Sequence, residues 1–197
     1  MRIDRTLFID FEGEGRKGPD RSILPCPLLA GVYKPGLGGT STRYEVKLLK
    51  TGLEPLKNGI SQITETLELP EFVEQIILKA ERENCVIVYW SEHELKVIEE
   101  LTPQLVGRFK EISFNAKPEA DRYLNQRNDH CREKQKKALN AYLAKICPKA
   151  KPVLSPRVGA AKSCKRLEAY CSKKRSWKTW TDAQKTVARD LIAYNRE

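Results

Sequence analysis

Two acidic residues at the end of an apolar segment near the N-terminus have the spacing of a metal-binding pair. Asp10 and Glu12 close the segment Thr6–Glu12 (TLFIDFE). Side chains alternate along a strand, so both carboxylates project from one face, with Cα atoms roughly 7 Å apart. Two such acids repel each other and resist burial unless a cation lies between them. The pair predicts a divalent-metal site; the alternative is an edge strand whose polar face is solvated.

The composition is that of a folded globular protein. The 197 residues are 40% hydrophobic and 31% charged, enough for one domain with a sizeable core. The longest apolar run, Cys85–Trp90, is far shorter than a membrane span, and the N-terminus lacks a signal-peptide segment. We therefore expect a soluble, cytoplasmic protein without a membrane partner. The cysteines have no CxxC spacing, which favours reduced thiols over a zinc site.

Charge divides the chain into two parts. Residues 1–116 contain 15 basic and 18 acidic residues, whereas residues 117–197 contain 21 basic and 8 acidic ones. This asymmetry favours metal chemistry in the first part and a surface for a polyanion, nucleic acid, in the second; the alternative is a solvated basic surface. We expect a single domain over residues 1–197, with a sheet core in 1–116 and a basic helical part in 117–197 that completes the site.

The hydrophobic pattern predicts an α/β fold with a mixed five-stranded sheet flanked by helices. The first three strands are joined by short connections and form an antiparallel meander, and the later strands are parallel. Thr51–Thr66 is expected to be irregular. The expected elements are strands at Thr6–Glu12, Cys26–Tyr33, Arg43–Leu48, Cys85–Trp90 and Arg108–Phe114, with helices beginning near Leu69 and Ser91.

The C-terminal part is expected to consist of helices and basic loops. The pattern predicts a helix over Cys131–Ile146, a loop to at least Val158, a helix with Ala160, Cys164, Leu167 and Cys171 on one face, and a last helix introduced by a capping box at Thr181–Gln184.

Between the last two helices lies a basic segment interleaved with aromatic residues. Its cations can grip phosphates while a tryptophan stacks on an unpaired base. In the alternative interpretation the tryptophans anchor the loop to the core. The candidate nucleic-acid-binding residues are Lys173, Lys174, Arg175, Trp177, Lys178 and Trp180.

Three stretches together resemble the ribonuclease H-like fold, specifically the DEDD exonuclease superfamily. They are Phe8–Gly13 (FIDFEG), Val88–Glu94 (VYWSEHE) and Leu191–Glu197 (LIAYNRE). The chain is most similar to the predicted ribonuclease H-like domains found with RecB-family nucleases and transposon-type proteins. This resemblance implies a nuclease that uses two Mg²⁺ or Mn²⁺ ions, and it fits a domain of a larger nuclease or helicase polypeptide.

Carried over to this sequence, the resemblance implies that Asp10 bridges both metal ions while Glu12 and Glu94 each complete one coordination sphere. Glu94 has a structural alternative, because Ser91-x-x-Glu94 is also a capping-box pattern. The family's last motif, Tyr-x-x-x-Asp, places Tyr194 beside the attacking water. Either its aspartate follows Glu197, or Glu197 or Asp190 takes its place, or the site is incomplete.

The expected function is therefore metal-dependent hydrolysis of phosphodiester bonds in DNA or RNA, from a single-stranded 3′ end. Two ions about 4 Å apart activate a water and stabilise the leaving oxygen, and hard cations prefer carboxylate oxygens. One alternative is a catalytically incomplete ribonuclease H-like module that binds nucleic acid or a protein. Another is an unrelated basic α/β interaction domain in which Asp10 and Glu12 are surface acids.

Overall fold

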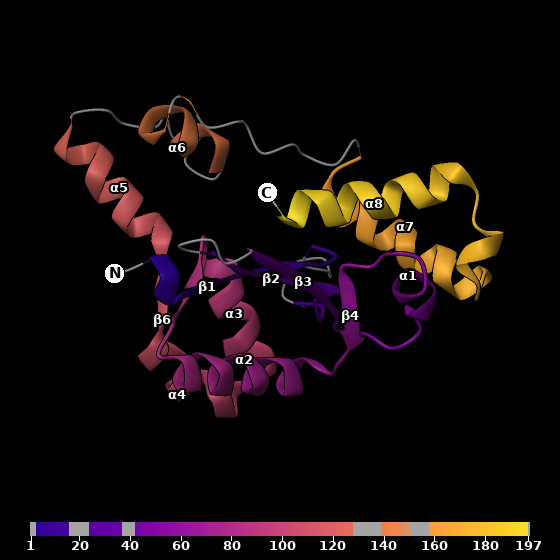
Figure 1. Ribbon diagram of the computed structural model, residues 1–197, viewed down its shortest axis with the longest axis horizontal. Coiled ribbons are helices and arrows are strands. Elements are labelled where there is room, and N and C mark those ends of the chain that lie inside the picture. The colour runs from indigo at the N-terminus through magenta and orange to yellow at the C-terminus, as the bar shows by residue number, and fades with distance from the viewer. Residues whose placement is uncertain are drawn as a thin grey trace.

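The fold is a six-stranded mixed sheet with helices on both faces. The computed structural model describes residues 3–15, 24–36, 42–127, 139–147, 149 and 158–196. The strands follow the order β4-β3-β2-β1-β5-β6 across the sheet, so β1 is central (Figure 1). The strands are β1 (Thr6–Glu12), β2 (Leu29–Lys34), β3 (Arg43–Leu48), β4 (Ile63–Thr66), β5 (Val86–Tyr89) and β6 (Ser113–Asn115).

The strand directions are those of a meander extended on both sides by parallel strands. β1, β2 and β3 are antiparallel, whereas β5 and β6 run parallel to β1 and β4 runs parallel to β3. The helices are α1 (Glu54–Lys57), α2 (Leu69–Glu83), α3 (Glu92–Leu101), α4 (Val106–Ile112), α5 (Ala116–Gln126), α6 (Leu139–Ile146), α7 (Ala160–Lys173) and α8 (Asp182–Arg196), with short 3₁₀ turns η1 (Ile3–Arg5), η2 (Pro103–Leu105) and η4 (Trp177–Thr179).

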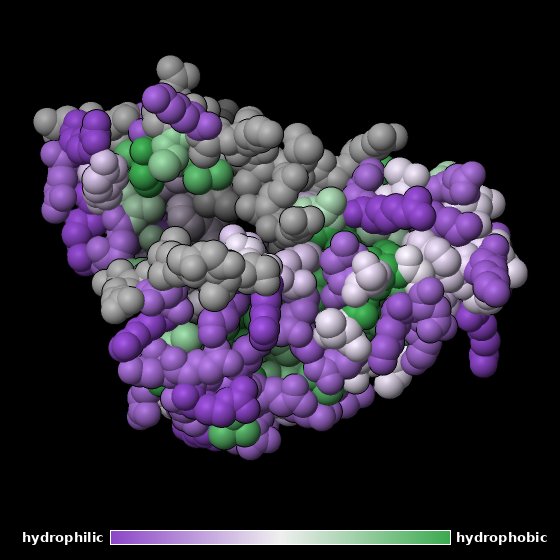
Figure 2. All heavy atoms as spheres, viewed as in Figure 1, coloured by the Kyte–Doolittle hydropathy of each residue, from purple (hydrophilic) through white to green (hydrophobic). Residues whose placement is uncertain are grey.

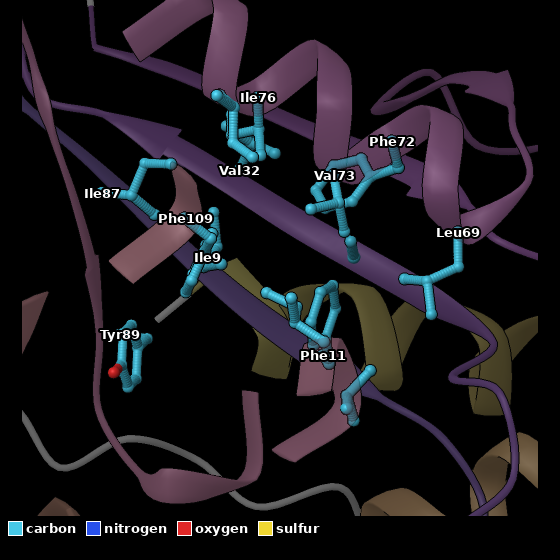
Figure 3. Close-up of a cluster of buried hydrophobic side chains, with 14 of the residues drawn as sticks. Ile9, Phe11, Val32, Leu69, Phe72, Val73, Ile76, Ile87, Tyr89 and Phe109 are labelled. Atoms are coloured by element: carbon cyan, nitrogen blue, oxygen red, sulfur yellow. The ribbon is translucent and has the colours of Figure 1, made fainter. Parts of the chain in front are cut away.

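One face of the sheet packs against α2, α3 and α4. Alternate residues of β1, among them Ile9 and Phe11, meet Phe72 and Val73 of α2 in a buried apolar cluster (Figure 3). Helix α2 begins with a proline in its first turn, and Asn84, the residue after its last one, closes it with a left-handed backbone (φ 49°). Helices α2 and α3 on this face follow from the helical periodicity of the sequence.

The opposite face packs against α1, α7 and α8. A second apolar cluster joins Val46 and Leu48 of β3 to Leu167 of α7 and Leu191 of α8. Figure 1 shows α7 and α8 lying across this face, with α2 and α4 beyond the other. The surface seen in Figure 2 is mostly hydrophilic, and hydrophobic residues reach it in small separate areas.

The sequence prediction was wrong in two parts of the sheet. Most of the expected strand Arg108–Phe114 is helix α4, because Val106, Phe109 and Ile112 are spaced by three residues and Phe109 is fully buried. Only the three residues of β6 are extended. The segment expected to be irregular contains α1 and β4, and β4 is held by its pairing with β3 rather than by a pattern of its own.

The C-terminal helices agree with the expected pattern where they are described. Cys164, Leu167 and Cys171 form the buried side of α7. Thr181 and Gln184 form the predicted capping box, with the Thr181 amide donating to Gln184 Oε1 (3.0 Å) and the Gln184 amide donating to Thr181 Oγ1 (3.3 Å). Of the expected helix Cys131–Ile146, the part before Leu139 lies outside the described residues. None of the described helices is long and apolar enough to cross a membrane.

Candidate functional site

Asp10 and Glu12 lie on the face of β1 that packs against α7 and α8. Phe11, between them, points into the opposite cluster, as the strand alternation predicts. Asp10 is half-buried and stands opposite Gly31 of β2, which has no side chain to fill the space beside it. Glu12 is only 8% exposed. The alternative interpretation, an edge strand with solvated acids, is therefore wrong, because β1 is central and Glu12 is buried.

Glu94 reaches the same region from the start of α3. Strand β5 runs parallel to β1, so the helix that follows β5 begins at the edge where β1 ends. The predicted capping box is present: the Ser91 amide and hydroxyl both donate to Glu94 Oε2, at 3.3 and 3.0 Å. Glu94 is nevertheless only 4% exposed and close enough to Glu12 to act on its charge. The cap holds the carboxyl group in place at the end of β1.

Burial makes the ionised forms of Glu12 and Glu94 unfavourable. Burial, and next the negative charge of Glu94, raise the pKa of Glu12 from 4.5 to about 7. A side-chain hydrogen bond with Asp10 acts in the opposite direction, and such a bond needs a proton on one of the two carboxyl groups. Burial also raises the pKa of Glu94, although hydrogen bonds from the cap and the charge of His93 oppose it.

Tyr194 completes this arrangement from the last helix. Burial, followed by the charges of Glu12 and Asp10, raises the pKa of its phenol, so the ring lies near both acids. The end of α8 is tied to the sheet by Tyr44 of β3, whose hydroxyl donates to the Ile192 carbonyl (3.1 Å). The structure thus brings together four side chains from segments that are far apart in the sequence.

Cys164 of α7 is a neighbour of the acids that the sequence interpretation missed. Its thiol is fully buried, and burial together with the charge of Glu12 raises its pKa to about 12. A thiol of such a high pKa stays protonated and serves as a small apolar group. Cys164 therefore adds a buried apolar group to the surroundings of Glu12. Its place on the buried face of α7 was predictable, but the face of the sheet that it covers was not.

The carboxylate groups of Asp10, Glu12 and Glu94 have the donor atoms and the negative charge that suit a hard divalent cation. Carboxylate oxygens are the preferred ligands of Mg²⁺ and Mn²⁺, and both residues that act on the pKa of Glu12 are acids. Among the described residues, no group of three or more His, Cys, Asp and Glu side chains is arranged to hold a metal ion. Asp190 lies one turn before Tyr194 in α8, and Glu197 lies outside the described residues.

The two tryptophans of the basic segment anchor it to the core. Trp180 is 3% exposed, and its indole N–H donates to the Lys174 carbonyl (3.2 Å). Trp177 packs on Trp180 (ring centroids 5.1 Å apart) and so tightly on Gly59 that a Cβ there would lie 2.0 Å from the indole. Of the two tryptophans expected to stack on a base, Trp180 is not available, because its ring is buried and its indole N–H is already bonded.

The basic side chains of this segment differ in whether they already have a hydrogen-bond or ion-pair partner. The Lys174 ammonium is held by the Thr179 carbonyl (3.1 Å) and Gln184 Oε1 (3.2 Å). Lys173, Arg175 and Lys178 are exposed and form no ion pair within the described part of the chain. These three remain candidate phosphate-binding residues.

The basic segment and the acids lie at opposite ends of α8. The segment precedes Asp182, the first residue of the helix, whereas Tyr194 is near its end. A rise of 1.5 Å per residue separates the two by roughly 18 Å along the helix axis. Comparisons with protein-family models, with curated proteins and with solved structures found no match to this chain.

Proposed function

We propose that this protein is a metal-dependent nuclease of the DEDD type with a ribonuclease H-like fold, which hydrolyses DNA or RNA from a single-stranded 3′ end. The observation that supports it is the electrostatic coupling of Tyr194 to Asp10 and Glu12, together with that of Glu12 to Glu94. These residues come from the three stretches of sequence that resemble the family. Their charges act on one another although the stretches are far apart in the chain. Burying these acids near one another is costly unless a ligand neutralises them.

In this proposal Asp10, Glu12 and Glu94 hold two Mg²⁺ or Mn²⁺ ions. When bound, the ions supply an activated water and stabilise the leaving oxygen of the phosphodiester. Ser91 fixes the Glu94 carboxyl group through its two hydrogen bonds. Tyr194 would orient the attacking water, because its phenol is protonated at neutral pH and can donate a hydrogen bond.

The test is Mn²⁺-dependent release of label from a 3′-labelled single-stranded oligonucleotide, with DNA and RNA substrates. We expect release by the wild type and its loss in Asp10→Asn. Asp182→Asn is the matched control, because Asp182 is an exposed aspartate at the far end of α8. A version with one aspartate added after Glu197 restores the motif spacing of the family. No release by any version, or equal release by Asp10→Asn, would reject the nuclease proposal.

A second candidate function is a module that binds single-stranded nucleic acid without cleaving it. Three exposed cations of the basic segment that form no ion pair within the described residues, Lys173, Arg175 and Lys178, favour this candidate, because phosphate binding needs no metal. Salt-sensitive oligonucleotide binding without cleavage in any version would support the module.

A further inference from the structure

Three aromatic rings form a row across the sheet beside the acids. Phe8 of β1 stands opposite Tyr33 of β2, and Tyr33 stands opposite Tyr44 of β3. Phe8 and Asp10 are two residues apart, so the row lies on the face that carries Asp10 and Glu12. Strand spacing places the Tyr33 and Asp10 Cα atoms roughly 8 Å apart. The row is therefore the next layer of side chains along the sheet from the candidate metal ligands.

The outer part of this row lines a cavity under α8. The cavity has a volume of about 680 Å³, which is within the range of small-molecule sites. Tyr33 and Tyr44 form its floor on the sheet, and the α8 residues Arg189, Ile192 and Ala193 border it (Figure 1 shows α8 above β2 and β3). Gln62, just before β4, lies at its side.

The lining has the chemistry that recognises a nucleotide. An aromatic ring offers a face to any base, and a guanidinium binds phosphate. Tyr33 is half-buried and touches Phe8 edge to face, with ring centroids 6.0 Å apart. Arg189 is exposed, lies 6.0 Å from the centre of the Trp177 ring, and forms no ion pair among the described residues. Gln62 adds an amide that can donate to and accept from a base edge.

Helix α8 connects this cavity to both features described above. Arg189 contacts Trp177 in the basic segment, whereas Tyr194, just over one turn further on, lies near Asp10 and Glu12. We propose that the cavity between β2, β3 and α8 holds one nucleotide of a single strand, its base stacked on Tyr33 and its phosphate at Arg189. For the class of ligand this inference rests on the proposed function, but it does not require cleavage.

The test measures binding of fluorescein-labelled oligo(dT) and oligo(U) by fluorescence anisotropy in EDTA. Tyr33→Leu is expected to weaken binding about tenfold, the effect of losing one base–aromatic stack, whereas Tyr33→Phe keeps the ring and the affinity. Tyr123→Leu is the matched control, because Tyr123 is 41% exposed on α5 and does not line the cavity. The two oligonucleotides distinguish DNA from RNA as the preferred strand.

Arg189→Gln provides a second variant at an exposed position that leaves the sheet intact. If Arg189 holds a phosphate, this variant lowers the slope of log affinity against log salt by about 0.7. Equal affinities of Tyr33→Leu and Tyr123→Leu, or an unchanged slope in Arg189→Gln, would overturn the inference. The nuclease proposal is judged separately by the loss of Mn²⁺-dependent cleavage in Asp10→Asn, whereas the binding assay in EDTA involves no cleavage.

Discussion

Replacing Glu12 by glutamine is expected to stabilise the metal-free protein at alkaline pH. The pKa of Glu12 rises from 4.5 to about 7 on folding, and each pKa unit corresponds to about 1.4 kcal/mol. Ionised Glu12 therefore costs the folded state about 3 kcal/mol at pH 8. Glutamine has nearly the same shape but carries no charge, so Glu12→Gln recovers up to this amount.

The sign of the pH dependence follows from the same shift. Between pH 4.5 and about 7 the folded protein binds more protons at Glu12 than the unfolded chain does. The contribution of Glu12 to the free energy of unfolding therefore falls as pH rises through this window. The advantage of Glu12→Gln should accordingly be small at pH 4.5 and reach its full value above pH 7.

Urea unfolding in EDTA, followed from pH 4.5 to 8.5, measures this difference. Glu74→Gln is the matched control, because Glu74 is exposed on α2 and its replacement is expected to change stability by less than about 0.5 kcal/mol. In a separate titration without EDTA, each Mn²⁺ ion bound at about 100 times its dissociation constant should raise the free energy of unfolding of the wild type by about 2.7 kcal/mol at pH 8. A difference between Glu12→Gln and wild type that is the same at pH 4.5 and pH 8 would refute the reasoning.

Three further results are expected. Ser91→Ala removes the hydroxyl that accepts from the His93 amide (3.2 Å), so it should lower the free energy of unfolding by about 1 kcal/mol in urea titrations and reduce the cleavage rate. Trp180→Ala should lower the free energy of unfolding by about 3 to 5 kcal/mol in the same titrations, because the ring is 3% exposed. Trp180→Phe should bind oligonucleotide like the wild type, because the buried ring is not available to a base. Replacing Lys173, Arg175 and Lys178 together by alanine should lower the salt slope of oligonucleotide binding by about 2 in anisotropy titrations, and an unchanged slope would show that these cations do not touch phosphate.

The central part of the site was predictable because it depends on local spacing. Alternation along β1 was sufficient to place Asp10 and Glu12 on one face. The capping pattern at Ser91 placed Glu94 at the start of a helix. Their proximity then follows from the parallel pairing of β1 with β5, which the apolar run before Ser91 indicated.

The features that the sequence did not predict depend on packing between distant segments. The aromatic row exists only in the register of β1, β2 and β3, which no single strand specifies. A basic segment with tryptophans is compatible both with base stacking and with anchoring of the segment to the core. Only the burial of Trp180 in the structure distinguishes these two interpretations. Helix α4 was mistaken for a strand because a short apolar segment fits either period.

The most direct test of the central claim is a calorimetric titration of Mn²⁺ into the protein at pH 7.5. If Asp10, Glu12 and Glu94 form a metal site, the wild type binds two ions per chain and Asp182→Asn behaves identically. Asp10→Asn should then lose binding, because it removes one of the three carboxylates that would hold the ions. Identical titrations of wild type and Asp10→Asn, or no Mn²⁺ binding by the wild type, would contradict the account.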